Sequence, residues 1–145
     1  MKTIITIGGN VNGYILPIIF LFLCSFTTSA QVGIGTTTPL STFEVNGSVG
    51  QKVTVVTTNT TLNDTYSLVI CNNGSTSITI TLPDASTIIG RIYTIKRDAS
   101  ATASVSIATT STQNIDGIST YTLANAKDAV TVVSDGVNWQ ITNKF

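Results

Sequence analysis

Residues 129–142 read AVTVVSDGVNWQIT, and this stretch indicates the class of fold. Apolar side chains recur at every second position on both sides of a central Asp135-Gly136 pair. Alternation at period two is typical of a half-buried β-strand. Because a type I′ turn needs positive φ at both of its central residues, an Asp-Gly pair between two such runs predicts a tight two-residue loop. The stretch therefore predicts two antiparallel strands joined by Asp135 and Gly136.

This predicted hairpin also sets a register. Pairing outward from the two-residue loop puts Val132 opposite Trp139 and Val130 opposite Ile141. A shift of one residue would move a strand's apolar side chains to the other face of the sheet. We therefore expect these four side chains to share one face and to belong to the core.

The same alternation continues through the rest of the chain. In residues 77–82, SITITL, the Ile and Leu side chains occupy one face and Thr79 and Thr81 the other, and Pro83 ends the run. We expect short strands at residues 53–57, 66–70, 77–82, 92–97, 103–108, 119–123, 129–134 and 137–142. Short strands with frequent polar turns predict an all-β chain with a single small antiparallel domain, either sandwich-like or barrel-like, or the protomer of a trimeric fibre.

A second turn signal is the Asn-Asn-Gly sequence at residues 72–74. A three-residue loop with Gly74 in the left-handed region pairs Leu68 with Ile78. A two-residue loop would instead pair Leu68 with Thr79 and turn one strand's apolar side towards water. The sequence therefore predicts a three-residue hairpin that depends on Gly74.

The first 30 residues have the features of an export signal. Residues 14–26, YILPIIFLFLCSF, carry no charge, and the run is shorter than the about 20 residues of a membrane-spanning helix. Lys2 precedes this run and small residues follow it up to Ala30, as in a secretory signal peptide. We predict cleavage near Ala30 and a secreted or cell-surface protein, with a retained anchor as the alternative. Residues 31–50 then form an extended lead-in with a short strand at 43–45, and residues 51–145 form the β domain.

Charge and composition argue against several functions. The chain has 7 basic and 7 acidic residues, a formal net charge of zero and no histidine. Without a basic surface we expect no nucleic-acid partner, and without histidine the commonest general base and metal ligand is absent. The aspartates at predicted turns, where a carboxylate caps its own backbone, are Asp84, Asp98, Asp116, Asp128 and Asp135. We therefore predict no catalytic residue, no cofactor and no metal site.

Two tyrosines are the candidate ligand contacts. Tyr121 lies next to a predicted turn, and Tyr93 lies in a predicted strand. An exposed aromatic ring offers an apolar body with a polar tip, which suits contact with a sugar. Trp139 is instead assigned to the core by the hairpin register. Tyr121 is therefore the stronger candidate and Tyr93 the second.

Several motifs carry a resemblance to known protein families. Residues 32–39, VGIGTTTP, followed by residues 43–49, FEVNGSV, resemble the VGIGTTxP…LdVnGsv segment of secreted surface proteins of Bacteroidetes and of phage tail-fibre-like proteins. The segments similar to a β domain repeated in such fibre and adhesin proteins are residues 78–83, 90–96, 115–117 and 132–139. The resemblance implies a β-rich surface or fibre module that trimerises and has no catalytic residues.

These observations lead to one leading hypothesis and two alternatives. We expect an exported, non-enzymatic structural or adhesion module that forms a homo-oligomer, with a trimer favoured. It would touch surface glycans or cell-envelope proteins through many weak contacts. The first alternative is a monomeric carbohydrate-binding module that uses exposed aromatic side chains. The second is a small hydrolase that uses two neighbouring carboxylates.

Overall fold

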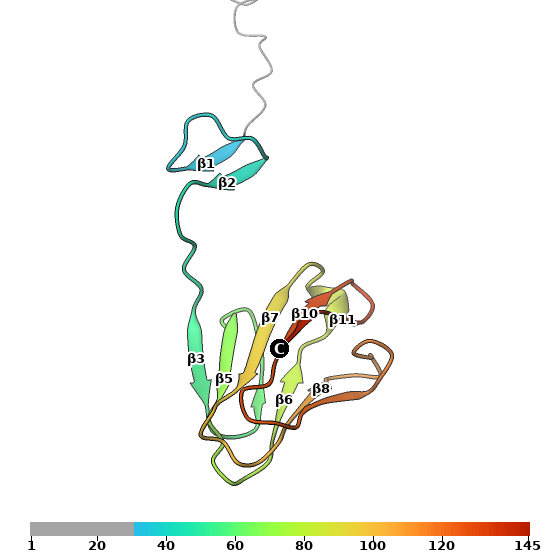
Figure 1. The fold of residues 1–145 in the computed structure, drawn as a ribbon. Helices are drawn as coiled ribbons and strands as arrows, with labels where there is room; N and C mark the ends of the chain where they lie inside the picture. The colour runs from blue at the N-terminus through green and yellow to red at the C-terminus, as the bar shows by residue number, and fades with distance from the viewer. Residues whose placement is uncertain (1–30) are drawn as a thin grey trace, which may run out of the picture. The chain divides into compact units, whose positions relative to one another are not determined.

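The protein is described by a computed structural model that covers residues 31–145 (Figure 1). The described residues divide into a short N-terminal unit that ends at Val49 and a domain, Gly50–Phe145. The predicted signal peptide and its cleavage site near Ala30 lie outside the described residues. Within residues 31–145 no helix is long and apolar enough to cross a membrane. The predicted all-β class is confirmed, since only the short 3-10 turn η1, Ala85–Thr87, interrupts the described strands.

The N-terminal unit is a small parallel ladder. Strand β1, Val32–Ile34, pairs in parallel with β2, Phe43–Val45. A Cβ atom at Gly33 would lie 2.6 Å from the Thr36 carbonyl oxygen. Gly35 has φ +72°, and a Cβ there would lie 2.9 Å from the Asn46 carbonyl oxygen. Both positions therefore require glycine, which gives the Gly-Ile-Gly sequence a structural reason.

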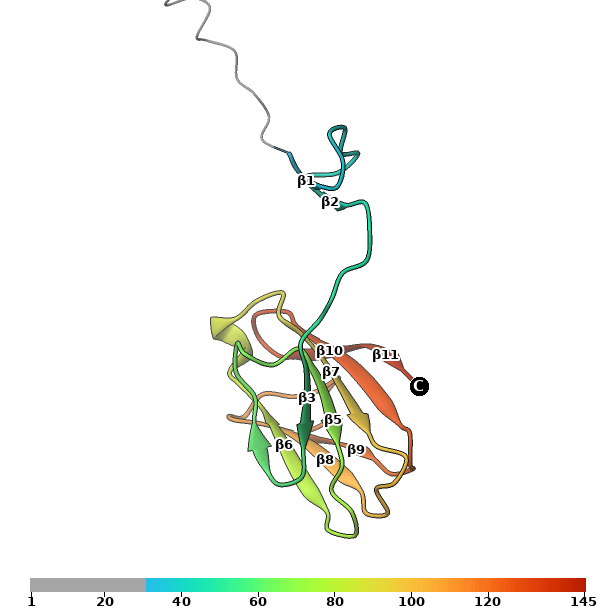
Figure 2. The ribbon, with the colours of Figure 1, turned by 90° about the vertical axis from the view of Figure 1, so that its left-hand side faces the viewer.

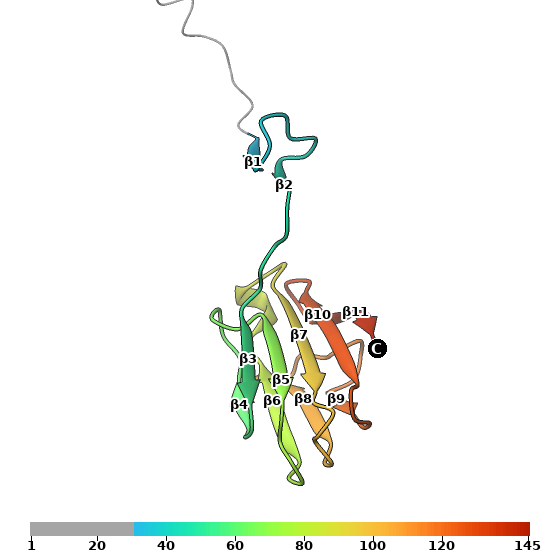
Figure 3. The same ribbon diagram turned by 60° about the vertical axis from the view of Figure 1, so that its left-hand side comes forward.

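The domain consists of two sheets that enclose one core (Figures 2 and 3). The five-stranded sheet has the order β11-β10-β7-β5-β3, and the four-stranded sheet has the order β4-β6-β8-β9. The strands are β3 Val53–Val56, β4 Thr60–Thr61, β5 Leu68–Cys71, β6 Ile78–Leu82, β7 Ile92–Arg97, β8 Val105–Thr109, β9 Thr120–Leu123, β10 Ala129–Ser134 and β11 Trp139–Lys144.

The chain winds between the two sheets instead of folding back as hairpins. From β3 to β8, consecutive strands alternate between the sheets, so each strand pairs in parallel with the next strand but one. Only the β8/β9, β7/β10 and β10/β11 pairs are antiparallel. The expectation of an antiparallel domain is therefore wrong. When the chain crosses to the other sheet and returns, the new strand runs in the same direction as the one before the crossing. One such crossing replaces the predicted hairpin at residues 72–74.

The predicted hairpin at residues 72–74 is one of these crossings. Leu68 lies opposite Val53 and Thr94 within the five-stranded sheet, whereas Ile78 lies opposite Val105 in the other sheet. The predicted pairing of Leu68 with Ile78 is therefore wrong, although Gly74 does have a left-handed φ of +57°.

Asn73 explains why this segment crosses. Its side chain is only 6 % exposed, and its Nδ2 donates hydrogen bonds to the carbonyl oxygens of Thr76, of Ala103 at 3.3 Å and of Ser104 at 3.5 Å. The Thr102 N–H donates to the Gly74 oxygen at 2.7 Å. The β5–β6 connection is thus joined to the β7–β8 connection, which follows the same path between the sheets.

The β10–β11 hairpin has a longer loop than predicted. Ser134 pairs with Trp139 across a four-residue loop, and Val132 pairs with Ile141. The Asp135 Oδ1 atom accepts the N–H groups of Val137 at 2.8 Å and Asn138 at 2.7 Å. These bonds stabilise the longer loop and make the predicted two-residue register wrong. Gly136 still supplies a positive φ, of +90°.

The bulge between Thr131 and Val132 shifts the register again, so that Val130 lies opposite Lys144 rather than opposite Ile141. Val130, Val132 and Trp139 are nevertheless fully buried, and Ile141 is half-buried against the core. Two extra residues in the loop and one extra residue in the bulge change the partners of these side chains without moving them out of the core.

Candidate binding face

Tyr93 is not available for a ligand. It is fully buried, its hydroxyl donates to the Asn63 carbonyl oxygen at 2.9 Å, and burial raises its pKa. The expectation that Tyr93 contacts a ligand is therefore wrong. The reason is that β7 is the central strand of its sheet, and Tyr93 shares the inward face with Ile95.

Tyr121 lies at the edge of the core. It is half-buried against core residues, and the Lys144 Nζ atom lies 5.2 Å from the centre of its ring. That separation is within the range of a cation–π contact. One part of the ring thus packs inward and another part is occupied by Lys144, so Tyr121 does not form an open stacking platform.

The aspartates at the turns are hydrogen-bond acceptors. Asp84 accepts from the hydroxyl and the N–H of Ser86, and Asp98 accepts in the same way from Ser100. These bonds lower the pKa of both carboxyls, and the N–H groups of Asn138 and Val137 lower the pKa of Asp135. The predicted capping role is confirmed for these three. Carboxylates held in the ionised form at separate turns are poor proton donors near neutral pH.

Cys71 is buried, and burial raises its thiol pKa to about 12. Among residues 31–145, no group of three or more His, Cys, Asp or Glu side chains could hold a metal ion. The thiolate is the reactive form of cysteine. We expect Cys71 in the folded protein to resist iodoacetamide at pH 8, while protein unfolded in urea is alkylated rapidly. Mass spectrometry of timed samples measures this, and equal rates in both states would contradict the burial of the thiol.

The outer face of the four-stranded sheet presents rows of hydroxyl groups. In β6 the side chains of Ile78, Ile80 and Leu82 are buried, so Thr79 and Thr81 point outwards. The strand register places outward-facing residues of β4, β8 and β9 beside these two threonines. We define the hydroxyl face as Thr61, Ser77, Thr79, Thr81, Ser104, Ser106, Thr120 and Thr122.

Two rows of this face follow directly from the pairing. Thr79, Ser106 and Thr122 form one row, and Thr81 and Thr120 flank Ala108 in the next. Side chains in a row are about 4.8 Å apart and successive rows are about 6.8 Å apart, from the ordinary dimensions of a sheet. The face is therefore a regular array and not a scatter of polar residues.

The hydroxyl face carries no ionisable side chain. Ser77 and Ser104 share a hydrogen bond of 3.2 Å between their Oγ atoms. The six other hydroxyls form no hydrogen bond with any group of residues 31–145. Each can donate one hydrogen bond and accept others. The face thus offers a neutral array of free donors and acceptors.

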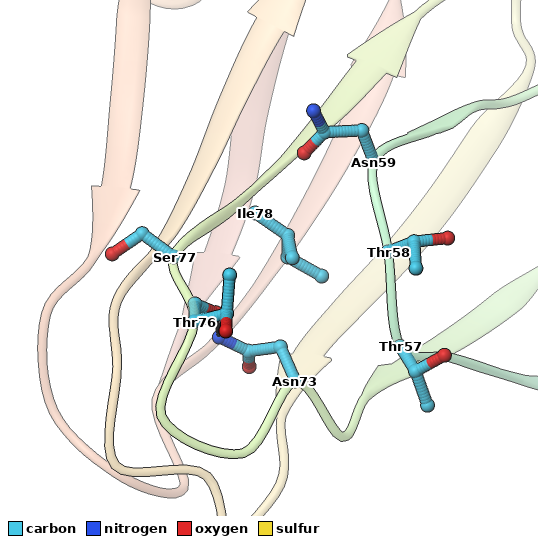
Figure 4. A pocket seen from close by; sticks show the side chains of 7 residues that line it. All are labelled: Thr57, Thr58, Asn59, Asn73, Thr76, Ser77 and Ile78. Atoms are coloured by element: carbon cyan, nitrogen blue, oxygen red, sulfur yellow. Dashed lines mark hydrogen bonds between the residues drawn. The ribbon is translucent and has the colours of Figure 1, made fainter.

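A groove of about 340 Å³ lies beside the hydroxyl face, at Ser77 (Figure 4). The β3–β4 connection forms one side of it and the β5–β6 connection the other, as Figure 4 shows. The Asn59 Oδ1 atom accepts the Thr79 N–H at 2.8 Å and so holds the first side against β6. The lining residues are Thr57, Thr58, Asn59, Asn73, Thr76, Ser77 and Ile78. Apart from Ile78 the lining is polar, and like the hydroxyl face it carries no charge.

Sequence reasoning did not identify this face as a site. The Thr-Ile-Thr and Thr-Tyr-Thr sequences at residues 79–81 and 120–122 were visible signals, because each puts two threonines on one side of a strand. Their alignment depends on β6 and β9 both pairing with β8. That pairing joins segments about 40 residues apart, which local alternation does not specify.

Comparison with known proteins adds no functional assignment. No family model matches the chain, and no curated protein matches it either.

Proposed function

We propose that the chain is an exported, non-enzymatic structural or adhesion module of a cell-surface or fibre-like assembly. In this proposal the hydroxyl face makes weak, repeated contacts with surface glycans or with cell-envelope proteins. The six hydroxyls without a hydrogen-bond partner within the described residues support it, because they lie on one uncharged face. The apolar run and the small residues that end at Ala30 support export.

The strength of such a surface comes from repetition. A hydrogen bond exchanged with water contributes only about 0.5–1.5 kcal/mol net. Several copies on one assembly bind more tightly than a single copy, because later contacts form within the complex already made. Self-association, for which the resemblance favours a trimer, is therefore part of this proposal.

The groove supports a second candidate function, a monomeric carbohydrate-binding module. Amide and hydroxyl groups line it without any charge, which suits a neutral polyhydroxylated ligand. In this form the candidate depends on the groove and no longer on Tyr93, which is buried. Substitution of Thr58 by Lys would block the groove and leave the hydroxyl face intact.

We expect the protein to bind an insoluble neutral polysaccharide, with cellulose and chitin as the probes, in a pull-down assay. Replacing Thr79, Thr81 and Thr122 with valine keeps the shape and strand preference of each residue and removes three hydroxyls. Loss of the three hydroxyl groups together should lower the affinity for the polysaccharide at least about tenfold. Binding by the natural sequence should be unchanged between about 50 and 500 mM salt, since the face has no charge to screen.

The matched control is Thr112→Val, in an exposed loop that is not part of the hydroxyl face. It should bind as the natural sequence does. Loss of binding in Thr58→Lys with full binding in the triple valine variant would favour the groove instead. Absence of binding to both polysaccharides, or full binding by both variants, would count against the contact role of these surfaces.

A further inference from the structure

The five-stranded sheet has an exposed apolar edge at β3 (Figure 3). The Val53 and Val55 side chains are 52 % and 59 % exposed. The register places Leu68 beside Val53 and Ile70 beside Val55, both on the same outward face. We call these four side chains the apolar strip. Val53 and Val55 are therefore free to contact the side chains of a further strand that pairs with β3, as cross-strand neighbours do.

The backbone of β3 is also unpaired on its outer side. The Leu68 N–H donates to the Lys52 oxygen at 3.1 Å, and the Asn72 N–H donates to the Val56 oxygen at 2.8 Å. Residues at every second position therefore face β5, and the N–H and C=O groups of Val53 and Val55 face away from it. β3 is the last strand of its sheet among the described residues. An edge of this kind is a template for pairing with another strand.

Little charge protects this edge. Lys52 precedes β3, but the strip itself contains no ionisable side chain. Across the sheet, Lys96 lies opposite Ile70 and donates its Nζ to the Lys127 carbonyl oxygen at 3.2 Å. Natural edge strands commonly carry a charge, a proline or a bulge that prevents association. Val53–Val56 contains none of these features.

We propose that two copies of this chain associate by antiparallel pairing of their β3 strands. Val53 of one copy then lies opposite Val55 of the other, and Thr54 lies at the twofold axis. The two apolar strips become one continuous face. Lys52 of each copy lies opposite Val56 of the other, so that the two lysines do not oppose one another. The edge is thus complementary to a second copy of itself, as a twofold interface requires.

The proposed function includes self-association, and the β3 edge is the surface that we assign to it; the inference rests on the proposed function only in this respect. Pairing of β3 strands joins two copies, whereas the trimer favoured by the sequence resemblance would need another surface. We expect light scattering during size-exclusion chromatography to give the mass of a dimer at concentrations of tens of micromolar. Val55→Lys should weaken the dimer at least about tenfold.

Two further variants make the test specific. Val55→Pro removes the outward N–H of the edge, a position where proline is tolerated, and should also give monomer. Val137→Lys changes a valine that is 68 % exposed in the β10–β11 loop, at the other end of the sheet, and should leave the dimer intact. Circular dichroism shows whether each variant is folded.

Three results would overturn the pairing: a monomer at all concentrations, a trimer, or a dimer that both folded Val55 variants leave unchanged. The polysaccharide pull-down distinguishes failure of the pairing from failure of the proposed function. A monomer that still binds polysaccharide through the hydroxyl face would contradict only the β3 pairing. A dimer that binds neither polysaccharide would contradict only the contact role of the hydroxyl face.

Discussion

We expect Trp139→Ala to lower the free energy of unfolding by about 3–5 kcal/mol, the usual loss for removing a large buried aromatic side chain. Trp139 is fully buried at the start of β11, and its ring centre lies 5.6 Å from that of Tyr93. Its Nε1 donates to the Pro83 carbonyl oxygen at 3.1 Å. The indole thus joins the five-stranded sheet to the end of β6 in the other sheet. Urea unfolding followed by circular dichroism measures the change.

Trp139→Phe separates the two roles of this side chain. Phenylalanine keeps most of the buried volume but leaves the Pro83 carbonyl without its donor, so we expect a smaller loss of about 1–3 kcal/mol. Val137→Ala, in the exposed loop before β11, should change the stability by no more than about 0.5 kcal/mol. A loss below about 1 kcal/mol for Trp139→Ala would contradict the central position of the indole in the core.

The second large effect is expected for Asn73→Ala, which should lower the free energy of unfolding by about 2–3 kcal/mol because it removes a buried amide that donates part-buried hydrogen bonds. The lost bonds join the β5–β6 connection to the carbonyl oxygens of Ala103 and Ser104. We also expect faster hydrogen exchange at the Thr102 and Ala103 amides, which donate to the Gly74 oxygen of the same connection.

The neighbouring Asn72 provides a matched control. It is exposed, and its side chain accepts one hydrogen bond of 3.2 Å from Ser100. Asn72→Ala should therefore have a small effect on stability and none on the exchange of the Thr102 amide. Equal effects of the two substitutions would show that the Asn73 side chain does not hold the crossing between the sheets.

The Asn73 prediction concerns the way in which the chain changes sheets, and this determines the binding face. The hydroxyl face exists because β6 lies between β4 and β8 as a parallel strand. In the predicted hairpin, β6 would have paired with β5, and Thr79 would have lain next to the apolar strand Leu68–Cys71 instead of in a row of hydroxyls. Asn73 thus contributes to the site although it only borders the groove.

The candidate site was only partly visible in the sequence. The alternation of residues 77–82 put Thr79 and Thr81 on a common face, and the structure agrees. The choice of Tyr93 was wrong, because an alternating strand shows which side chains share a face but not which face is inward. Tyr93 shares its face with Ile95, and both belong to the core.

The class of fold, the positions of most strands and the side chains that share a face follow from the amino-acid sequence alone. Period-two alternation is a local property, so it identified β6, β7 and β10 without any knowledge of their neighbours. It missed β1 and the two-residue β4, which are too short to show a period.

The order of the strands and the directions in which they run follow instead from packing within the folded domain. A turn sequence such as Asn-Asn-Gly permits both a hairpin and a crossing, and the choice depends on hydrogen bonds to a connection about 30 residues away. The β10–β11 register likewise depends on how the Asp135 carboxylate binds its own loop. Local patterns fix the face of a strand, whereas its partners follow from packing between distant segments.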